Sequence, residues 1–179
     1  MTDEAHDAPI APAASWRLIE PTDIPFVYQL VAAVDPRWWR FSRFGLEPAQ
    51  LLQTTAGIPA GAIVLDEAGR PVAAAILADV ASVGTAGFEF YALPLPAAEA
   101  LARRFAPDLI VAAFEGAELR RLYYERFQND ADVLGEFAAL FEVEVTMPEF
   151  AMIDGAYEDR TTSVLTAERL TQWRQAATR

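Results

Sequence analysis

The sequence predicts one α/β (α+β) domain: a central mixed, mostly antiparallel sheet flanked by helices, with a β-hairpin near the C-terminus. Two-residue alternation and helical periodicity follow one another in the order strand, helices, strands, helix, strand, helix, hairpin, which favours one sheet covered by helices. The 179 residues suffice for one substantial core and contain neither a repeat nor a linker. Their composition, 53% hydrophobic and 22% charged, is typical of a folded protein.

Residues 1–15 are predicted to form a disordered, acidic, Pro/Ala-rich tail, and residues 16–175 the domain. The tail lacks the basic-then-apolar order of a signal peptide, and no apolar run reaches the about 20 residues that span a bilayer. We therefore expect no membrane partner. The sequence contains no cysteine, which excludes disulfides and thiol chemistry and is compatible with a cytoplasmic protein.

The charge balance limits the partners. With 14 basic and 26 acidic side chains, a net charge of −12, the chain argues against a nucleic-acid partner, because phosphate contacts need clustered Lys and Arg. The same negative field attracts a cationic or amine-bearing ligand. His6 lies in the tail and is given no role.

The first elements follow the tail. Residues 16–19 are predicted to form a short strand, and a turn at Glu20 and Pro21 leads into a helix. Thr22 or Asp23 is its expected N-cap, with Pro25 in the first turn. A second short helix is expected to begin at Pro48.

The middle of the chain favours strands. Residues 62–80 predict a hairpin, because two β-rich runs flank a turn at residues 67–70 and Pro71 restarts the second run. Residues 86–93 predict a further strand, with Phe88 and Phe90 on one face and Glu89 and Tyr91 on the other.

The later elements are less uniform. Residues 97–116 have a helical pattern, but Pro107 lies inside it and is expected to break or kink the helix. Residues 119–127 suit either a strand or a helix. Residues 129–140 predict a helix with Asn129 or Asp130 as N-cap, and residues 141–170 a long hairpin that turns at Asp154 and Gly155.

Four stretches, in this order, resemble the GNAT superfamily of N-acyltransferases. They are "WRLIEPTDIPFVYQL", "IVLDEAGRPVAAAILADV", the spacing of twelve residues from Asn129 to Phe141 with Glu144 after it, and "IDGAYED". The resemblance covers residues 16–173 and is nearest to the branch with the ribosomal-protein N-terminal acetyltransferases and antibiotic acetyltransferases. It implies acetyl-CoA or another acyl-CoA as cofactor and an amine as acceptor.

The stretch "YALPLPAAEALARRF" (residues 91–105) departs from that family. In the family, a proline ends the fourth strand, and Arg-Gly-x-Gly-x-Ala then binds the coenzyme A pyrophosphate through backbone N–H groups at a helix N-terminus. With Pro94 placed on that proline, Ala97 stands for the arginine, and Ala98 and Ala100 stand for the glycines. Their methyl groups are expected to crowd the phosphates. Glu99 adds repulsion, which the two arginines at 103 and 104 could partly offset.

Other family residues also differ. Asp132 stands where this branch often has a serine near the cofactor thiol, and Leu140 replaces a glycine. An alternative register makes residues 108–127 the fifth strand followed by the fourth helix, and Pro107, which would then precede a strand, favours it. The spacing from Asn129 to Phe141 favours the first register, which we prefer.

The resemblance implies a set of site residues. Glu89 is the candidate base, and Tyr91 could position substrate or donate a proton. In the alternative register, Tyr123 or Tyr124 lies near the position of the tyrosine that protonates the departing thiolate; since the two are adjacent and only one can face the cleft, Tyr124 is taken as the candidate. A solvated carboxylate and packed tyrosines are the structural alternatives. The implied cofactor-binding residues are Leu93, Ala97, Ala98, Ala100, Arg103, Arg104 and Asn129.

An aromatic cluster marks the expected acceptor side. It contains Trp38, Trp39 and Phe41, flanked by arginines, and either lines an acceptor pocket or packs a helix on the sheet. No metal-ligand spacing, Ser/His/Asp set or Walker-type loop is present in the sequence, so we expect neither a metal nor a nucleoside triphosphate.

Three functional hypotheses follow. The first is an atypical acyl-CoA-dependent N-acyltransferase, in which the amine of a small molecule or peptide attacks the thioester directly. The second is a non-catalytic relative that binds a ligand or a protein, and the third an enzyme that uses the same cleft without coenzyme A. A homodimer is compatible with each of them.

Overall fold

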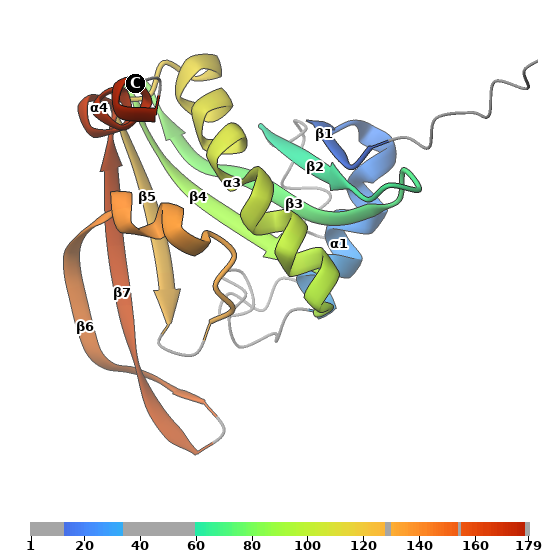
Figure 1. Cartoon of the computed structure of the whole chain (residues 1–179). Helices are drawn as coiled ribbons and strands as arrows, with labels where there is room; N and C mark the ends of the chain where they lie inside the picture. The colour runs from blue at the N-terminus through green and yellow to red at the C-terminus, as the bar shows by residue number, and fades with distance from the viewer. Residues whose placement is uncertain (1–12, 34–59, 128–129, 154, 178–179) are drawn as a thin grey trace, which may run out of the picture.

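The computed structural model describes residues 13–33, 60–127, 130–153 and 155–177, which form one sheet of seven strands in the order β1-β2-β3-β4-β5-β7-β6 (Figure 1). Neighbouring strands are antiparallel, except that β4 and β5 run parallel. The predicted mixed, mostly antiparallel sheet is therefore confirmed. The strands are β1 (Ser15–Leu18), β2 (Gly61–Leu65), β3 (Pro71–Ala81), β4 (Thr85–Ala92), β5 (Arg121–Phe127), β6 (Glu142–Ile153) and β7 (Ala156–Thr166).

Helices cover both faces of the sheet (Figure 1). Helix α1 (Ile24–Ala33) packs Leu30 and its neighbours against Ile63 and Ala74 on one face. Helix α3 (Pro96–Gly116), the 3-10 helix η3 (Gly135–Leu140) and helix α4 (Ala167–Ala177) contribute to the larger core on the other face. In the described part of the chain, no helix is both long enough and apolar enough to cross a membrane.

The start of α1 differs from the sequence prediction. A 3-10 turn, η1 (Pro21–Asp23), with Glu20 as its N-cap, precedes the helix, and Asp23, one of the two predicted cap residues, lies directly before the first helical residue, Ile24. The Asp23 carboxylate reaches back to accept the Glu20 N–H at 2.8 Å, which closes a reciprocal capping arrangement. The 3-10 turn itself was not predicted from the sequence. The helix predicted from Pro48 lies outside the described residues.

The predicted β2–β3 hairpin is confirmed. Asp66 closes its turn by accepting the N–H groups of Ala68 and Arg70, both at 2.9 Å. Gly69 adopts φ +75° there, a conformation that glycine reaches without steric cost. The predicted faces of β4 are also confirmed, because Phe88 and Phe90 are buried in the larger core.

Helix α3 runs through Pro107, so of the two expected effects, a break or a kink, the break does not occur. A proline inside a helix removes one hydrogen bond and costs about 3 kcal/mol. The buried face of α3 opposes this cost, since side chains three and four residues apart pack on the sheet, Phe105, Leu109 and Ile110 among them. Because residues 108–116 are helical and Arg121–Phe127 is a strand, the alternative register is wrong, and the helix that the preferred register places over residues 97–116 is confirmed.

The helix predicted over residues 129–140 is mostly absent from the described residues. Only the short η3 forms, and its N-cap is Leu134 instead of Asn129 or Asp130. Gly135 has φ +56°, which prevents a right-handed helix from running through this point. Val133 and Leu134 are buried in the core just before it, so packing decides the path of this segment.

The long hairpin of β6 and β7 is confirmed, with Gly155 at φ +82° in its turn. The predicted strand extended to residue 170, but β7 ends at Thr166 and α4 begins at Ala167. The Arg169 N–H donates to Thr166 Oγ1 at 3.3 Å, as at a helix N-cap. Leu170 is buried in the core beneath α4, which explains why the apolar alternation of the strand ends here.

Candidate active site

Strands β4 and β5 pair only over their first halves. Their parallel ladder begins at Thr85 and Arg121 and ends at Phe88 and Tyr124. Beyond that point β4 remains paired with β3, and β5 with β7, so the two strands diverge (Figure 1). We call this place, with the side chains of Glu89, Tyr91, Tyr124 and Asp130, the strand-parting site.

Two predicted catalytic residues on β4 contact each other. The phenol of Tyr91 donates a hydrogen bond to Glu89 Oε2 at 3.0 Å, and Tyr91 packs against the smaller core on the α1 side of the sheet. Burial raises the pKa of Tyr91 well above its ordinary value, and the nearby Glu89 charge raises it further. The phenol of Tyr91 therefore remains protonated and holds the Glu89 carboxylate in place.

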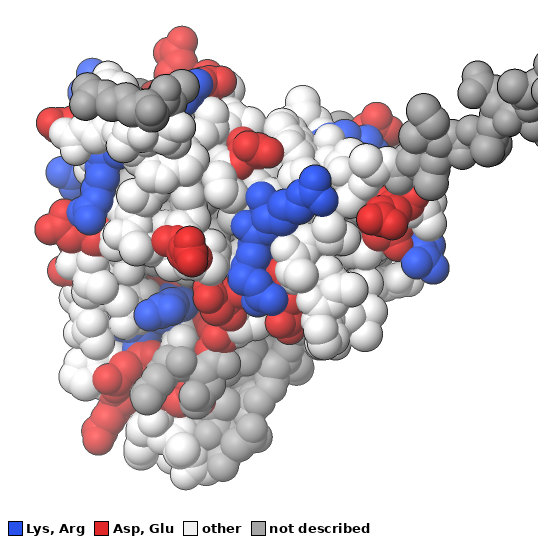
Figure 2. All heavy atoms as spheres, viewed as in Figure 1, with Lys and Arg blue, Asp and Glu red and all other residues white. Residues whose placement is uncertain are grey.

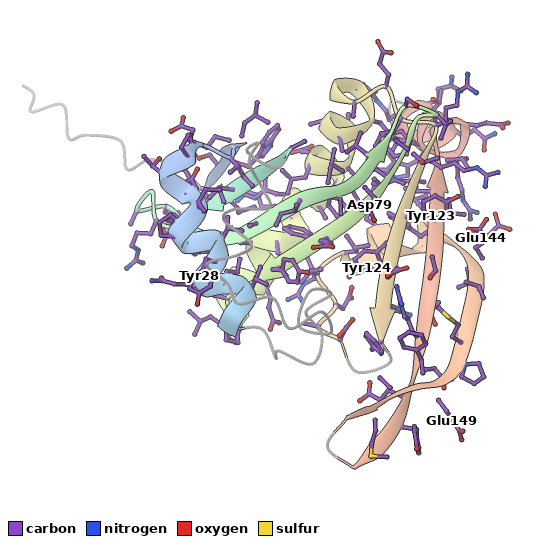
Figure 3. All side chains as sticks on the ribbon, turned by 180° about the vertical axis from the view of Figure 1, so that it is seen from behind. Tyr28, Asp79, Tyr123, Tyr124, Glu144 and Glu149 are labelled. Carbon is purple, nitrogen blue, oxygen red and sulfur yellow. The ribbon has the colours of Figure 1, made fainter. Side chains whose placement is uncertain are left out.

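Tyr124 occupies the opposite face of the sheet. Its ring packs against Phe88, with centroids 6.5 Å apart, and against Phe141, at 5.9 Å. Figure 3 shows Tyr124 on the side of β5 that faces β4. Burial raises the pKa of Tyr124, and the charge of Asp130 adds to the shift. Since adjacent strand residues point to opposite faces, Tyr123 lies on the other face.

Asp130 is the member of the site that sequence reasoning missed. It was considered only as a helix cap, but its Oδ2 accepts the Phe127 N–H at 2.8 Å. Its charge adds to the effect of burial in raising the pKa of both Tyr91 and Tyr124. Burial raises the pKa of Asp130 itself. No local sequence pattern indicated this role, because it depends on the position of Asp130 beside two strands.

The connection from β4 to α3 carries most of the predicted cofactor residues. The Leu93 N–H extends the β4 ladder by bonding to the Val72 carbonyl at 2.9 Å. Leu95 is the N-cap of α3 and provides no side-chain cap. Ala98 is 2% exposed and buried beneath the helix, whereas Ala97 and Ala100 are exposed. The expected crowding at the surface therefore comes from two methyl groups and not from three.

The two arginines of α3 differ in their contacts. The Arg103 guanidinium lies 3.8 Å from Glu99 and donates to the Asp132 carbonyl at 2.9 Å. The Arg104 side chain is exposed, with its guanidinium 5.2 Å from the centre of the Phe105 ring. Figure 2 shows basic side chains over α3 with acidic ones around them.

Four predicted site residues, Trp38, Trp39, Phe41 and Asn129, lie outside the described residues, so their roles stay predictions. Within the described part of the chain, no three His, Cys, Asp or Glu side chains are grouped in a way that could hold a metal ion.

Comparisons of sequence gave no relative: no family model matches the chain, and no curated protein does either. Comparisons of structure gave many. A mutant of the spermidine N-acetyltransferase SpeG from Vibrio cholerae matches with a TM-score of 0.70 and 16% identity, covering 90% of this chain and 98% of that one. The SpeG structure with manganese ions, from the same organism, has a TM-score of 0.68 and 15% identity, with coverage of 92% and 96%.

A protein provisionally named phosphinothricin N-acetyltransferase matches with a TM-score of 0.66 and 16% identity, covering 86% of this chain and 98% of that one. Identities this low establish the fold and leave the activity open. These neighbours do not support the ribosomal-protein branch of the resemblance. The chain therefore has the fold of the GNAT N-acetyltransferases, as the order of its sequence motifs predicted.

Proposed function

We propose that the chain is an atypical acyl-CoA-dependent N-acyltransferase that transfers an acyl group to an amine at the strand-parting site. One observation carries this proposal. In a GNAT fold, the only parallel strand pair of the described sheet ends beside the ionisable side chains of Glu89, Tyr91 and Tyr124. Amine acylation needs a proton acceptor and a proton donor close together, and these residue types can provide both.

The start of α3 fits a phosphate-bearing cofactor. Glu99 is bonded through its N–H to the Leu95 carbonyl at 3.0 Å, and Pro96 has no N–H, so the helix provides no partner for the N–H groups of Ala97 and Ala98. Such groups and the helix dipole favour a phosphate. A bound acyl-CoA would supply the thioester carbonyl that the amine attacks.

The side chains of the site have separate roles in this proposal. Glu89 accepts the proton that the attacking amine loses, while the Tyr91 hydroxyl, 3.0 Å from Glu89 Oε2, fixes the carboxylate. Tyr124 remains protonated because it is buried and donates that proton to the departing sulfur. The base and the acid thus come from opposite faces of the sheet and act where its two strands diverge.

The acceptor is proposed to be a cationic amine of a small molecule or peptide. The net charge of −12 attracts such a ligand. The names of the structural neighbours, spermidine and phosphinothricin N-acetyltransferases, also refer to acceptors that carry an amine. The aromatic residues Trp38, Trp39 and Phe41 remain the proposed wall of the acceptor pocket.

A second candidate is a non-catalytic GNAT-fold module that binds a ligand or a protein. The first turn of α3 favours it, because Ala97 and Ala100 place methyl groups at the surface and Glu99 places an acid there. The guanidinium of Arg103, one turn further along α3, is already engaged with Glu99 and the Asp132 carbonyl. Both features weaken the binding of an anion.

Calorimetry with acetyl-CoA and longer acyl-CoAs, and thiol release with a panel of amines that includes spermidine, separate the two candidates. We expect binding heat and amine-dependent thiol release. We also expect Tyr124→Phe to lower kcat about 100-fold, whereas the matched control Tyr123→Phe, on the opposite face of β5, leaves kcat nearly unchanged. If no donor binds and no thiol is released, the non-catalytic candidate replaces the enzyme.

A further inference from the structure

We propose that Phe150 is a specificity-determining residue for the acceptor: together with Phe127 it binds an aromatic or other apolar group that the amine carries. This inference rests on the proposed function, since it names the class of acceptor for the strand-parting site. We call Phe127 and Phe150 the aromatic pair, and the centroids of their rings lie 6.1 Å apart. Neither residue was a site candidate from the sequence.

The aromatic pair lies on the side of the sheet from which the amine is expected to approach. Phe88 and Tyr124, the last pair of the β4–β5 ladder, both point into the core on the α3 side. Side chains alternate along a strand, so Glu89 of β4 and Phe127 of β5 point to the α1 side. The proposed base and the aromatic pair therefore share one face, on the two strands that diverge.

Phe150 reaches this face because a bulge interrupts strand β6. Met147 pairs with Arg160 and Ala151 pairs with Glu158, so the three residues of β6 between these pairs oppose one residue of β7. In an unbroken strand, Phe150 would point away from the face that Ala151 shares with Arg160. The bulge turns the Phe150 side chain back toward Arg160, and bulges beside functional sites commonly redirect a side chain in this way.

A side chain of β7 fixes the bulge. The Glu149 N–H donates to Asp159 Oδ1 at 2.9 Å. Glu149 adopts φ +50°, which is uncommon for a residue other than glycine and persists where surrounding contacts enforce it, often at binding sites. Pro148 fits the bulge because it has no N–H to give to the ladder. Figure 3, seen from the α1 side, shows Glu149 on the hairpin beyond the end of β5.

Arg160 holds the Phe150 ring and limits what the ring can bind. Its guanidinium carbon lies 4.9 Å from the centre of the Phe150 ring, and the guanidinium also forms an ion pair with Glu125. Thr162 Oγ1 lies 3.5 Å from the other carboxylate oxygen of Glu125. The ring thus already attracts one cation through its electron-rich face, which suits it better to an apolar group than to a second ammonium.

These contacts select among the amines that the net charge attracts. The reaction needs one ammonium, whose proton Glu89 accepts, and the aromatic pair favours an apolar body, because rings pack against one another in offset or edge-to-face contact. We therefore expect an arylalkylamine such as phenethylamine to be a better acceptor than spermidine. It should also be better than ethylamine, which carries the same charge as phenethylamine and has no ring.

Two variants and a control test the role of the ring. Phe150→Ala removes one ring of the aromatic pair, whereas Phe150→Leu keeps an apolar side chain and provides the comparison if Phe150→Ala does not fold. The matched control is Met152→Ala, because Met152 is 61% exposed on the same strand and, as the neighbour of Ala151, points to the opposite face. Urea denaturation reports the folding of each variant.

The first measurement is the binding of phenethylamine by calorimetry, with coenzyme A present, which does not depend on turnover. We expect Phe150→Ala to raise the Kd about tenfold, Phe150→Leu to raise it by a smaller factor, and Met152→Ala to leave it unchanged. Ethylamine should bind more weakly, and equally to the unmodified chain and to Phe150→Ala. No binding of phenethylamine, or equal Kd values in the unmodified chain and both Phe150 variants, overturns the proposal.

The second measurement is acyl transfer at high ionic strength, where long-range attraction of charged acceptors is screened. We expect Phe150→Ala to raise the KM for phenethylamine about tenfold and to leave kcat nearly unchanged, because the ring contacts the acceptor away from the reacting atoms. A lower KM for spermidine than for phenethylamine in the unmodified chain overturns the acceptor class, while thiol release still supports the proposed function. If no thiol is released but phenethylamine binding depends on Phe150, the proposed function fails and the aromatic pair remains a binding site.

Discussion

At the scale of single residues, Arg17 and Asp23 show how one ion pair joins two elements. The two terminal nitrogens of Arg17 donate to the two oxygens of Asp23 at 2.6 and 2.7 Å, and Asp23 is only 5% exposed. Such a two-bond contact is stronger and more directional than an ordinary surface pair. Because the same carboxylate also caps the turn before α1, through the Glu20 N–H, it fixes the helix relative to β1.

Replacing Asp23 by Asn should lower the free energy of unfolding at neutral pH by about 2 kcal/mol, since a buried carboxylate then loses charged hydrogen bonds. The hydrogen bond from Arg17 is the main cause of the lowered pKa of Asp23. A lowered pKa means that the stabilisation is present above the unfolded value of about 3.9 and is lost as the pH falls through the folded value.

Urea denaturation at several pH values checks this prediction. The stability gap between the unmodified chain and Asp23→Asn should be largest near neutrality and should narrow below about pH 4. The exposed Asp108 of α3 provides the matched control, and Asp108→Asn should change the stability by less than about 0.5 kcal/mol. A gap that is independent of pH contradicts the role assigned to the carboxylate charge.

At the scale of elements, the parts that were predictable from sequence are those fixed by local chemistry. The two hairpins were found because Gly69 and Gly155 mark turns that glycine favours. The continuity of α3 through Pro107 and the short length of η3 were not found, because packing against the sheet decides both of them. Asp130 could not be recognised for the same reason, since its partners lie on two strands.

Gly135 offers a test of how η3 is attached to α3. Its φ is +56°, and a Cβ built on it would lie 3.2 Å from Arg103 Cδ. Gly135→Ala should therefore lower the free energy of unfolding by about 1–2 kcal/mol. The control is Gly116→Ala at the end of α3, where the added Cβ meets no atom within 4 Å other than those of its chain neighbours and of the surrounding helix backbone. A change of at most about 0.5 kcal/mol is expected there.

Chemical denaturation of the two glycine variants gives the comparison. Equal losses of stability in Gly135→Ala and Gly116→Ala would show that backbone strain and the Arg103 contact have no special effect at residue 135.

At the scale of the whole molecule, the fold could be predicted because several weak motifs occur in the family's order along most of the chain. The activity could not be predicted in the same way, because the catalytic proposal depends on where the parallel strands β4 and β5 stop pairing. The last pair is Phe88 with Tyr124, and Glu89 follows directly after it on β4. The end of this pairing is determined by the whole sheet, and no local sequence pattern indicates it. The effect of the altered first turn of α3 likewise depends on tertiary structure, because Ala98 is buried beneath the helix whereas Ala97 and Ala100 are exposed.

The net charge of −12 gives a prediction that belongs to the molecule as a whole. A negative field concentrates a cationic acceptor near the protein and repels an anionic donor, and dissolved salt weakens both effects. Raising the ionic strength should therefore increase the KM for a polyamine, up to roughly tenfold, and lower the KM for acyl-CoA, while kcat remains nearly constant.

Steady-state kinetics at a series of salt concentrations, with a polyamine and an uncharged aromatic amine as acceptors, makes the comparison. The KM of the uncharged amine should depend little on salt, because it carries no charge for the field to act on. A polyamine KM that is equally insensitive to salt would mean that the acceptor reaches the strand-parting site without help from the protein's charge, and the acidic composition would then not be a determinant of acceptor choice.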